Sequence, residues 1–475
     1  MRRNPFAIAA LALCAGVLTG CASTPIGPPQ LDVPAVSPQT SNSLATDHWW
    51  TAFNDPALDK LVDEALAHNL DLAAAITRVD YARSQVLFAQ SDLYPSVDLV
   101  GNASRDRSTQ SATNPLPPGY SPITQDFRLG VQASYELDLW GKYRTATLAA
   151  RKDLLASEYA RETVRTVVAA QTAQTYFNLV AADAQLVLLE DTLKSREESL
   201  SLQRDQLQAG VIGEFEFRTA EAERASVAGD VAVARRAVSE DESALAVLAG
   251  RSPRAVFDPQ IERDRQVKAF TTVPQIPAGL TSDLLQRRPD IQQSEAQLAA
   301  ANLRIDVARA DYFPAISLTG VFGSESGLLK NLFSGPAMIW GVGAALAQPL
   351  VGLKAIEANV DAQTARRNEA VADYTKIVQS AFKDTHDALS ANRTTREALA
   401  AQSERATKLS QALELSDLRY KSGYSPYLEV LDSQRQLLQA QTLQINAALN
   451  ARVALVDLAK ALGGGWDYPN AIAGR

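Results

Sequence analysis

Residues 71–101 read DLAAAITRVDYARSQVLFAQSDLYPSVDLVG, and residues 290–320 read DIQQSEAQLAAANLRIDVARADYFPAISLTG. Each stretch begins with helix-forming residues and ends, after an aromatic–proline pair, in a short run that alternates between apolar and polar residues. The matched residues are Leu66, Asn69, Asp71, Leu72, Ala82, Ala89, Tyr94, Pro95, Leu99 and Gly101 in the first copy, and Leu285, Arg288, Asp290, Ile291, Ala301, Ala308, Phe313, Pro314, Leu318 and Gly320 in the second. The chain therefore contains an internal duplication.

A second set of matching segments follows each copy. QAGVIGEFEF at 208–217 returns as KSGYSPYLEV at 421–430, and LAG at 248–250 returns as ALG at 461–463. Each copy is far longer than the roughly 20–50 residues of a solenoid unit. The sequence therefore predicts two structural repeats, 56–265 and 279–465, followed by a C-terminal tail at 466–475. Each repeat has the order helix, strand pair, very long helix, glycine tip and return helix.

The N-terminus has the pattern of an export signal. Arg2 and Arg3 precede an apolar core, which is typical of a signal peptide. The segment ends in Leu18-Thr19-Gly20-Cys21, which resembles a bacterial lipobox, so we expect residues 1–20 to be removed and Cys21 to carry a covalent lipid. An ordinary secretory leader cut nearby is the alternative. Ala22 favours sorting to the outer membrane, and residues 21–55 are predicted to form a tether and an equatorial segment.

Composition excludes several classes of function. The net charge of −8 comes with no basic patch, which argues against nucleic-acid binding. The three histidines, His48, His68 and His386, have no metal-ligand spacing, and the chain has neither a nucleophile elbow nor a phosphate loop. We therefore expect no enzyme, no metal and no cofactor other than the lipid on Cys21. Downstream of the leader, no run approaches the roughly 20 apolar residues of a membrane helix.

Two segments are predicted to be exceptionally long helices. Neither glycine nor proline occurs from Lys142 to Ala209 or from Leu353 to Ser422. At 1.5 Å per residue, a helix of about 65 residues is about 100 Å long. Leucines recur at three-, four- and seven-residue steps, as a packed helical stripe requires. Breaks follow at Gly210 and Gly213 in the first repeat and at Gly423 and Pro426 in the second, so each long helix is expected to turn back as an antiparallel hairpin.

In the segments between the predicted helices, apolar residues recur at every second position, which is the spacing of a β-strand. Residues 127–139 alternate apolar and polar side chains, and 339–347 alternate less sharply. The preceding strands, at about 96–104 and 315–323, follow Pro95 and Pro314, where proline costs no ladder hydrogen bond. The loops 105–126 and 324–337 are polar and rich in Pro or Gly. This pattern suits a transmembrane barrel with lipid on one face and water on the other, although a half-buried soluble sheet would show it too.

Four strands cannot close a barrel, because about eight are needed even around a filled interior. Open strand edges are not tolerated in lipid. If the strands span a membrane, several copies must therefore join, and three copies would supply twelve strands, an even number in the known range.

At this point the sequence resembles the TolC-type outer-membrane factors, specifically the lipoprotein branch represented by OprM and NodT. The resemblance covers essentially the whole mature chain. It is carried by the segments HWWTAFNDPAL at 48–58, NLDL at 69–72, ELDLWGK at 136–142, RRPDI at 287–291, YFPAI at 312–316, and Arg419-Tyr420 through Leu431-Asp432.

The resemblance implies an α+β membrane protein with a duplicated TolC-like fold. Its members are homotrimers: a twelve-stranded β-barrel with four strands per chain, joined to a long α-helical periplasmic tunnel with a small mixed equatorial domain. They act as passive exit ducts for drugs or other small toxic compounds. Their partners are a periplasmic adaptor (membrane fusion) protein, an inner-membrane transporter of the RND type, and outer-membrane lipid. A type I protein-secretion channel, or a lipid-anchored periplasmic coiled-coil scaffold without a pore, is the alternative.

The resemblance also implies a periplasmic gate near the second tip. Glu429 and Asp432 match a constriction ring, and a three-residue spacing places both carboxylates on one helix face. Leu428 matches an apolar plug, Tyr420 and Arg435 match gate-lock positions, and Glu216 matches an acidic partner. Ser425 stands where some members have a basic lock residue. The alternative is that these residues are solvated faces of a coiled coil.

Overall fold

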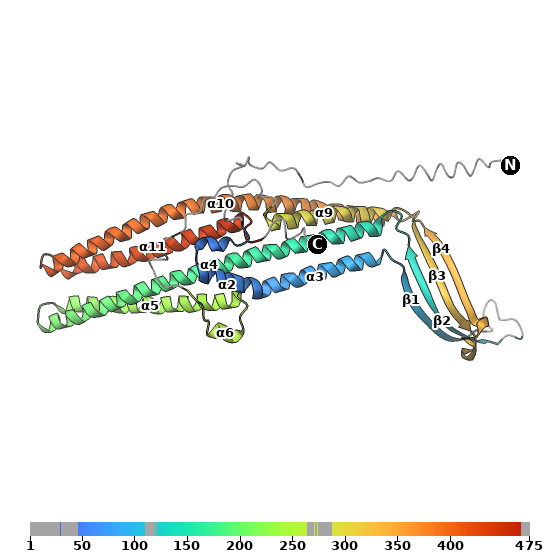
Figure 1. The fold of residues 1–475 in the computed structure, drawn as a ribbon, viewed down its shortest axis with the longest axis horizontal. Coiled ribbons are helices and arrows are strands. Elements are labelled where there is room, and N and C mark those ends of the chain that lie inside the picture. The colour runs from blue at the N-terminus through green and yellow to red at the C-terminus, as the bar shows by residue number, and fades with distance from the viewer. Residues whose placement is uncertain are drawn as a thin grey trace. The chain divides into compact units, whose positions relative to one another are not determined.

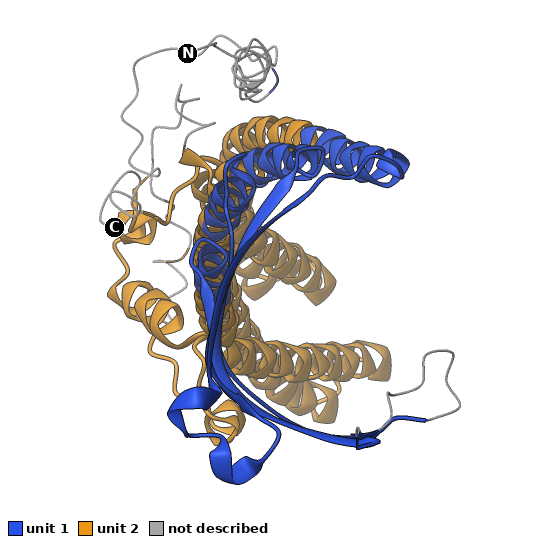
Figure 2. Ribbon diagram, turned by 90° about the vertical axis from the view of Figure 1, so that its right-hand side faces the viewer, with its two compact units in different colours: residues 1–30, 81–154, 295–373 blue, residues 31–80, 155–294, 374–475 orange. Residues whose placement is uncertain are grey.

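The computed structural model describes residues 29, 46–109, 119, 121–263, 270, 273 and 287–466. Cys21, the leader 1–20 and most of the predicted tail lie outside these residues. The chain divides into two compact units, coloured separately in Figure 2. The first comprises 1–30, 81–154 and 295–373, and the second comprises 31–80, 155–294 and 374–475.

The elements follow the predicted order in both repeats (Figure 1). The first repeat contains α2 (Pro56–His68), α3 (Leu70–Ser91), β1 (Ser96–Arg107), β2 (Ile123–Glu136), α4 (Lys142–Gln208) and α5 (Glu214–Leu248). The second contains α9 (Pro289–Ala310), β3 (Ala315–Ser326), β4 (Met338–Ala347), α10 (Leu353–Lys421) and α11 (Tyr427–Ala461). The short elements are η1 (Trp49–Phe53), α6 (Pro253–Phe257), η2 (Leu329–Asn331) and η3 (Gly335–Ala337).

The two glycine- and proline-free segments are single helices, of 67 residues in α4 and 69 in α10. Within the described part of the chain, no helix has a stretch apolar enough to cross a membrane.

The four strands form one antiparallel sheet in the order β1-β2-β3-β4, within the first unit. The sheet is curved (Figure 2). The strands β1 and β3 extend to Arg107 and Ser326, beyond the predicted ends at 104 and 323. The strand β2 begins at Ile123 and ends at Glu136, so the prediction of 127–139 was wrong at both ends. The apolar alternation at Leu137 and Leu139 had suggested strand, but that segment leads into α4.

The sheet has two chemically different faces. On neighbouring strands, Leu99 lies opposite Val131, Val131 opposite Phe322, and Phe322 opposite Trp340. The side chains of these four residues therefore share one face of the sheet. All four are exposed. The opposite face carries polar side chains, among them Arg128 and Glu325, which form an ion pair of 3.2 Å. The predicted alternation is therefore present in β1, β2 and β3, whereas the second face of β4 carries only Ile339, glycines and alanines.

A pair of opposed glycines lies on the polar face, where Gly130 of β2 faces Gly323 of β3. A Cβ atom on Gly323 would lie 2.4 Å from the carbonyl oxygen of Leu129, and one on Gly130 would lie 2.9 Å from that of Phe322. The two strands therefore approach each other more closely here than any residue with a side chain would allow.

The core of the second unit surrounds the segment before the first repeat. Trp49 and Trp50 are each 1% exposed, and they pack with Leu58 and Leu179 among other apolar residues of this core. The hydroxyl group of Tyr176 donates a 2.7 Å hydrogen bond to Asp55, the N-cap of α2. The two tryptophans are therefore packing residues, which fix the start of the first repeat against α4.

We predict that Gly323→Ala destabilises the sheet, because its methyl group would overlap the backbone of Leu129. Overpacking of this kind costs about 1–3 kcal/mol. The matched control is Gly320→Ala on the same strand, where nothing lies within 4 Å of the added carbon. Thermal unfolding in detergent, followed by circular dichroism, should show a lower midpoint for Gly323→Ala alone. Equal midpoints for the two variants would contradict the close approach.

Candidate functional site

The candidate site comprises the tips of the two helical hairpins, where the chain turns from α4 into α5 and from α10 into α11. Gly210 and Gly423 adopt φ values of +73° and +76°, which favour glycine. The same cap closes both long helices: Val211 N donates to Gln206 O at 2.8 Å, and Tyr424 N donates to Arg419 O at 2.9 Å. The duplicated glycines therefore terminate equivalent helices with equivalent hydrogen bonds.

The return helices begin differently. Gly213 is the N-cap of α5, and its backbone N–H donates to Oε2 of Glu216 at 3.1 Å. Pro426 is the N-cap of α11. The carboxylate of Glu216 thus satisfies one of the unpaired donors at the start of its own helix, an arrangement that resembles one half of a capping box.

Three of the predicted gate residues on the second hairpin, Tyr420, Glu429 and Asp432, form contacts within that hairpin. The rings of Tyr420 and Tyr427 meet edge to face with centroids 5.4 Å apart. Glu429 lies 3.5 Å from the guanidinium group of Arg419, and Asp432 accepts a hydrogen bond from Gln436. Leu428 is exposed. The turns also carry three other exposed apolar side chains: Val211, Phe215 and Tyr424.

Arg435 links the two hairpins, because its guanidinium group donates to the carboxylate of Glu223 on α5. Glu223 is about two helical turns beyond Glu216. The hydrogen bond from Arg435 lowers the pKa of the Glu223 carboxyl, outweighing partial burial, and the same contact raises the pKa of Arg435. The structure thus brings Arg435 to Glu223, while Glu216 contacts its own helix start.

A second link joins α4 to α11 beside the first. Arg196, which is only 5% exposed, donates to the side-chain oxygen of Gln434. Its positive charge also contributes to lowering the pKa of Glu223. Sequence reasoning missed Arg196, Glu223 and Gln434. The available signal was that Gln434 directly precedes Arg435, and that Glu223 follows Glu216 at heptad spacing, on the same face of α5.

The described residues contain no cluster of three or more His, Cys, Asp or Glu side chains placed to hold a metal ion. Charged side chains at the tips instead pair with one another, as Glu429 does with Arg419, accept from a neutral side chain, as Asp432 does from Gln436, or cap a helix start, as Glu216 does. This arrangement can hold helices together or release them.

Solved structures with this architecture are outer-membrane channels. The chain superposes on the CmeC outer membrane channel of Campylobacter jejuni with a TM-score of 0.84 at 29% identity, covering 93% of this chain and 95% of that one. It superposes on the open state of the MtrE outer membrane channel of Neisseria gonorrhoeae with a TM-score of 0.78 at 32% identity, covering 92% and 98%. The fold is that of the TolC-like outer-membrane channels.

The family model described as outer membrane efflux protein matches residues 61–251 and 280–464, and the chain belongs to that family. It is 36% identical over 468 residues to the probable efflux pump outer membrane protein TtgC of Pseudomonas putida, which covers 96% of this chain and 95% of the relative. It is 31% identical over 460 residues to the cation efflux system protein CusC of Escherichia coli, with 95% and 97% covered. The two matched segments correspond closely to the two predicted repeats.

We predict that Glu223→Gln loosens the contact between the hairpins and raises conductance in a planar bilayer. A partly exposed pair contributes at most about 1 kcal/mol, or up to about a fivefold change in the open-to-closed ratio. Because the pKa of Glu223 is lowered, the contribution is present above its ordinary pKa of 4.5 and is lost as the pH falls through the lowered value. The difference from wild type should therefore vanish on acidification.

The control for this experiment is Glu221→Gln, because Glu221 pairs with Arg218 on the same helix. It should leave conductance unchanged. Equal effects of the two substitutions would show that charge loss on α5, rather than the link to Arg435, is responsible.

Proposed function

We propose that three copies of this chain form a passive exit channel in the outer membrane, with a twelve-stranded barrel and a helical periplasmic tunnel, and that the chain catalyses no reaction. The observation that carries the proposal is the sheet. Within the described residues, β1 and β4 each pair with a strand on one side only. Three sheets of four strands, joined β4 to β1, would satisfy every edge, as lipid requires.

The chemistry of the two sheet faces supports this arrangement. The exposed side chains of Leu99, Phe322 and Trp340 suit contact with hydrocarbon. Arg128 and Glu325, on the opposite face, suit a water-filled interior. A soluble sheet with this apolar face would need a covering layer of protein.

We further propose that the channel works with a periplasmic adaptor and an inner-membrane transporter of the RND type. The relatives are named as outer-membrane components of efflux pumps, including an antibiotic pump and a toluene pump of Pseudomonas putida, each 36% identical to this chain. Exposed apolar side chains at the tips, such as Phe215 and Tyr424, offer a surface for the adaptor. Drugs or other small toxic compounds are the proposed cargo.

Lipidation of Cys21 is part of the proposal and rests on the lipobox at 18–21 alone. The lipid would anchor the N-terminus in the outer membrane. The proposed channel therefore has one covalent lipid per chain and no other cofactor.

The gate proposal assigns Glu429 and Asp432 to acidic rings at the narrowest point, with Leu428 as an apolar plug and Tyr420 and Arg435 as locks. In a trimer each carboxylate occurs three times, and rings of acids favour cations. The contacts of Tyr420 with Tyr427, and of Arg435 with Glu223, would hold the second hairpin in place.

We predict that the double variant Tyr420→Phe, Asp432→Ala raises single-channel conductance, because a few weak polar contacts suffice to bias a two-state tip. The matched control is Tyr427→Phe, which keeps both gate positions. Unchanged conductance in the double variant would refute the gate assignment and leave the channel proposal intact.

The whole proposal is tested by purifying the mature chain, determining its mass in detergent, and recording currents in a planar bilayer. A trimer of lipid-bearing chains with small, cation-preferring currents is the expected result. A monomer, or a species that does not conduct even when Glu429 and Asp432 are replaced, would favour a coiled-coil scaffold. A chain mass without lipid would overturn the assignment of Cys21 alone.

A further inference from the structure

The apolar face of the sheet carries two charged side chains, and both are arginines. The pairing of β1 with β2 is continuous along the whole of β1, so the side chains of β1 alternate strictly between the two faces. Arg105 and Arg107 therefore lie on the same face as Leu99. Every other residue that the strand pairing places on this face of the described sheet is uncharged, and most are apolar.

Neither arginine is neutralised by a neighbour. Both are exposed, and among the described residues neither has an ion-pair partner. The acidic residues nearest to them on the two strands, Asp106 and Asp126, lie on the opposite face. This face of the sheet therefore has a local positive charge at one end and no charge elsewhere.

Lengths along the strands place the two arginines at the edge of an apolar band. On β2, the apolar positions of this face run from Tyr135 to Phe127, which is about 27 Å at about 3.4 Å per residue. Arg105 lies opposite Gln125, two positions further along β2, at about 34 Å. A strand tilt of about 40° reduces these lengths to heights of about 21 and about 26 Å, and the apolar band of a membrane barrel is about 25 Å tall. Arg105 thus lies at the boundary of such a band, and Arg107 lies just beyond it.

The connection from β3 to β4 begins at the same end of the sheet, away from α3 and α4 (Figure 1). Here Leu329 and Phe333 are 62 and 80% exposed. Between them lies Lys330, which is also exposed and has no ion-pair partner among the described residues. Exposed apolar side chains beside a cation are typical of a segment at a membrane surface, where the cation meets anionic lipid headgroups.

We propose that Arg105, Arg107 and Lys330 bind the anionic headgroup of a glycolipid in the outer leaflet of the outer membrane. We call these three residues the basic rim. Leu329 and Phe333 lie against the acyl chains of the same lipid layer. The inference rests on the proposed channel, in which the long helices are periplasmic and the opposite end of the sheet therefore reaches the outer leaflet.

The spacing of the two arginines favours a glycolipid over a phospholipid. Side chains two residues apart on one face of a strand are about 7 Å apart along it. Guanidinium groups bind phosphate or carboxylate through two parallel hydrogen bonds each. Two of them at this spacing fit a headgroup with anionic groups on more than one sugar, whereas the headgroup of a phosphatidylglycerol has a single phosphate.

The test is binding to the intact mature protein in detergent, titrated by native mass spectrometry. The probes are lipid A with two phosphates, dephosphorylated lipid A with the same acyl chains, and phosphatidylglycerol. The phosphorylated lipid A should bind more tightly than either of the others. Because a cation near a lipid surface contributes about 1 kcal/mol, Arg105→Gln and Arg107→Gln should each weaken its binding about fivefold.

The matched control is Arg128→Gln, which removes the same charge from the opposite face of β2 and should leave lipid binding unchanged. Lys330→Gln, outside the strands, should also weaken binding about fivefold and decides the matter if the strand variants do not fold. Equal binding of phosphorylated and dephosphorylated lipid A, equally tight binding of phosphatidylglycerol, or equal effects of Arg107→Gln and Arg128→Gln would overturn the proposal.

Mass and conductance are measured on the same preparations, so that this inference and the channel proposal can fail separately. A conducting trimer that does not discriminate between the lipids would overturn the basic rim alone. A monomer that does not conduct would overturn the channel.

Discussion

The constraint on which the structure depends is that every backbone N–H and C=O group of a strand needs a partner wherever water is absent. Four strands per chain leave two unsatisfied edges in the described sheet, at β1 and β4. The same sheet presents an apolar face that includes the exposed side chains of Leu99 and Trp340. In the proposed trimer, pairing of β4 of one copy with β1 of the next would satisfy both edges.

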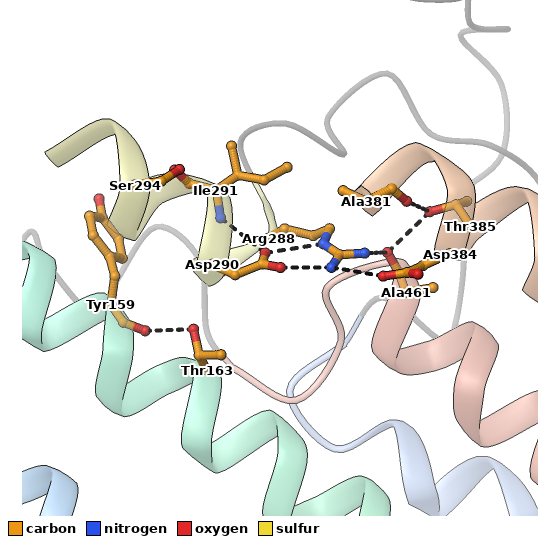
Figure 3. Close-up of polar contacts among 10 residues, drawn as sticks. All are labelled: Tyr159, Thr163, Arg288, Asp290, Ile291, Ser294, Ala381, Asp384, Thr385 and Ala461. Carbon is orange, nitrogen blue, oxygen red and sulfur yellow. Dashed lines mark hydrogen bonds and ion pairs between the residues drawn. The ribbon is translucent and has the colours of Figure 1, made fainter. Parts of the chain in front are cut away.

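The duplication shows which features the fold requires and which it leaves free. Both hairpins end their long helix with the same glycine cap, at Gly210 and Gly423. Both repeats bring a glycine against a backbone carbonyl at their base, at Gly250 and Gly463. The side chains that support the base differ, with an asparagine amide in one copy and the ion-paired guanidinium group of Arg288 in the other (Figure 3). The two repeats therefore share their backbone geometry at the base of each hairpin, where two segments of the chain come into close contact, and differ in the side chains around it.

Much of the fold was predictable from sequence because its signals are local. The absence of glycine and proline predicted α4 and α10, and period-two alternation predicted the strands. The end of β2 was misplaced because Leu137 and Leu139 continue the alternation. In the structure, however, Asp138 between them accepts hydrogen bonds from the backbone N–H groups of Tyr143 and Arg144, and so prepares the start of α4. Alternation alone does not distinguish a strand from a turn that follows it.

The contacts of the candidate gate were less predictable, because they depend on how two helices are rotated about their axes. Arg435 could have faced any acidic residue along α5, and its actual partner is Glu223. A local rule would have placed Glu216 correctly, since a carboxylate at the third position of a helix commonly binds the N-cap backbone. The family resemblance indicated which positions belong to the candidate gate. The residue that each of these side chains contacts could be identified only from the three-dimensional structure.

The contacts Arg435–Glu223 and Arg196–Gln434 lie within one chain and join its two hairpins to each other. In the proposed trimer, the six hairpins are therefore coupled in pairs, and the tunnel end has three independent moving parts instead of six. Dilation of such an end would retain threefold symmetry in its intermediate steps only if all three pairs moved together. Movement of a single pair would produce an off-centre opening, so the order in which the pairs separate determines the shape of the first passage.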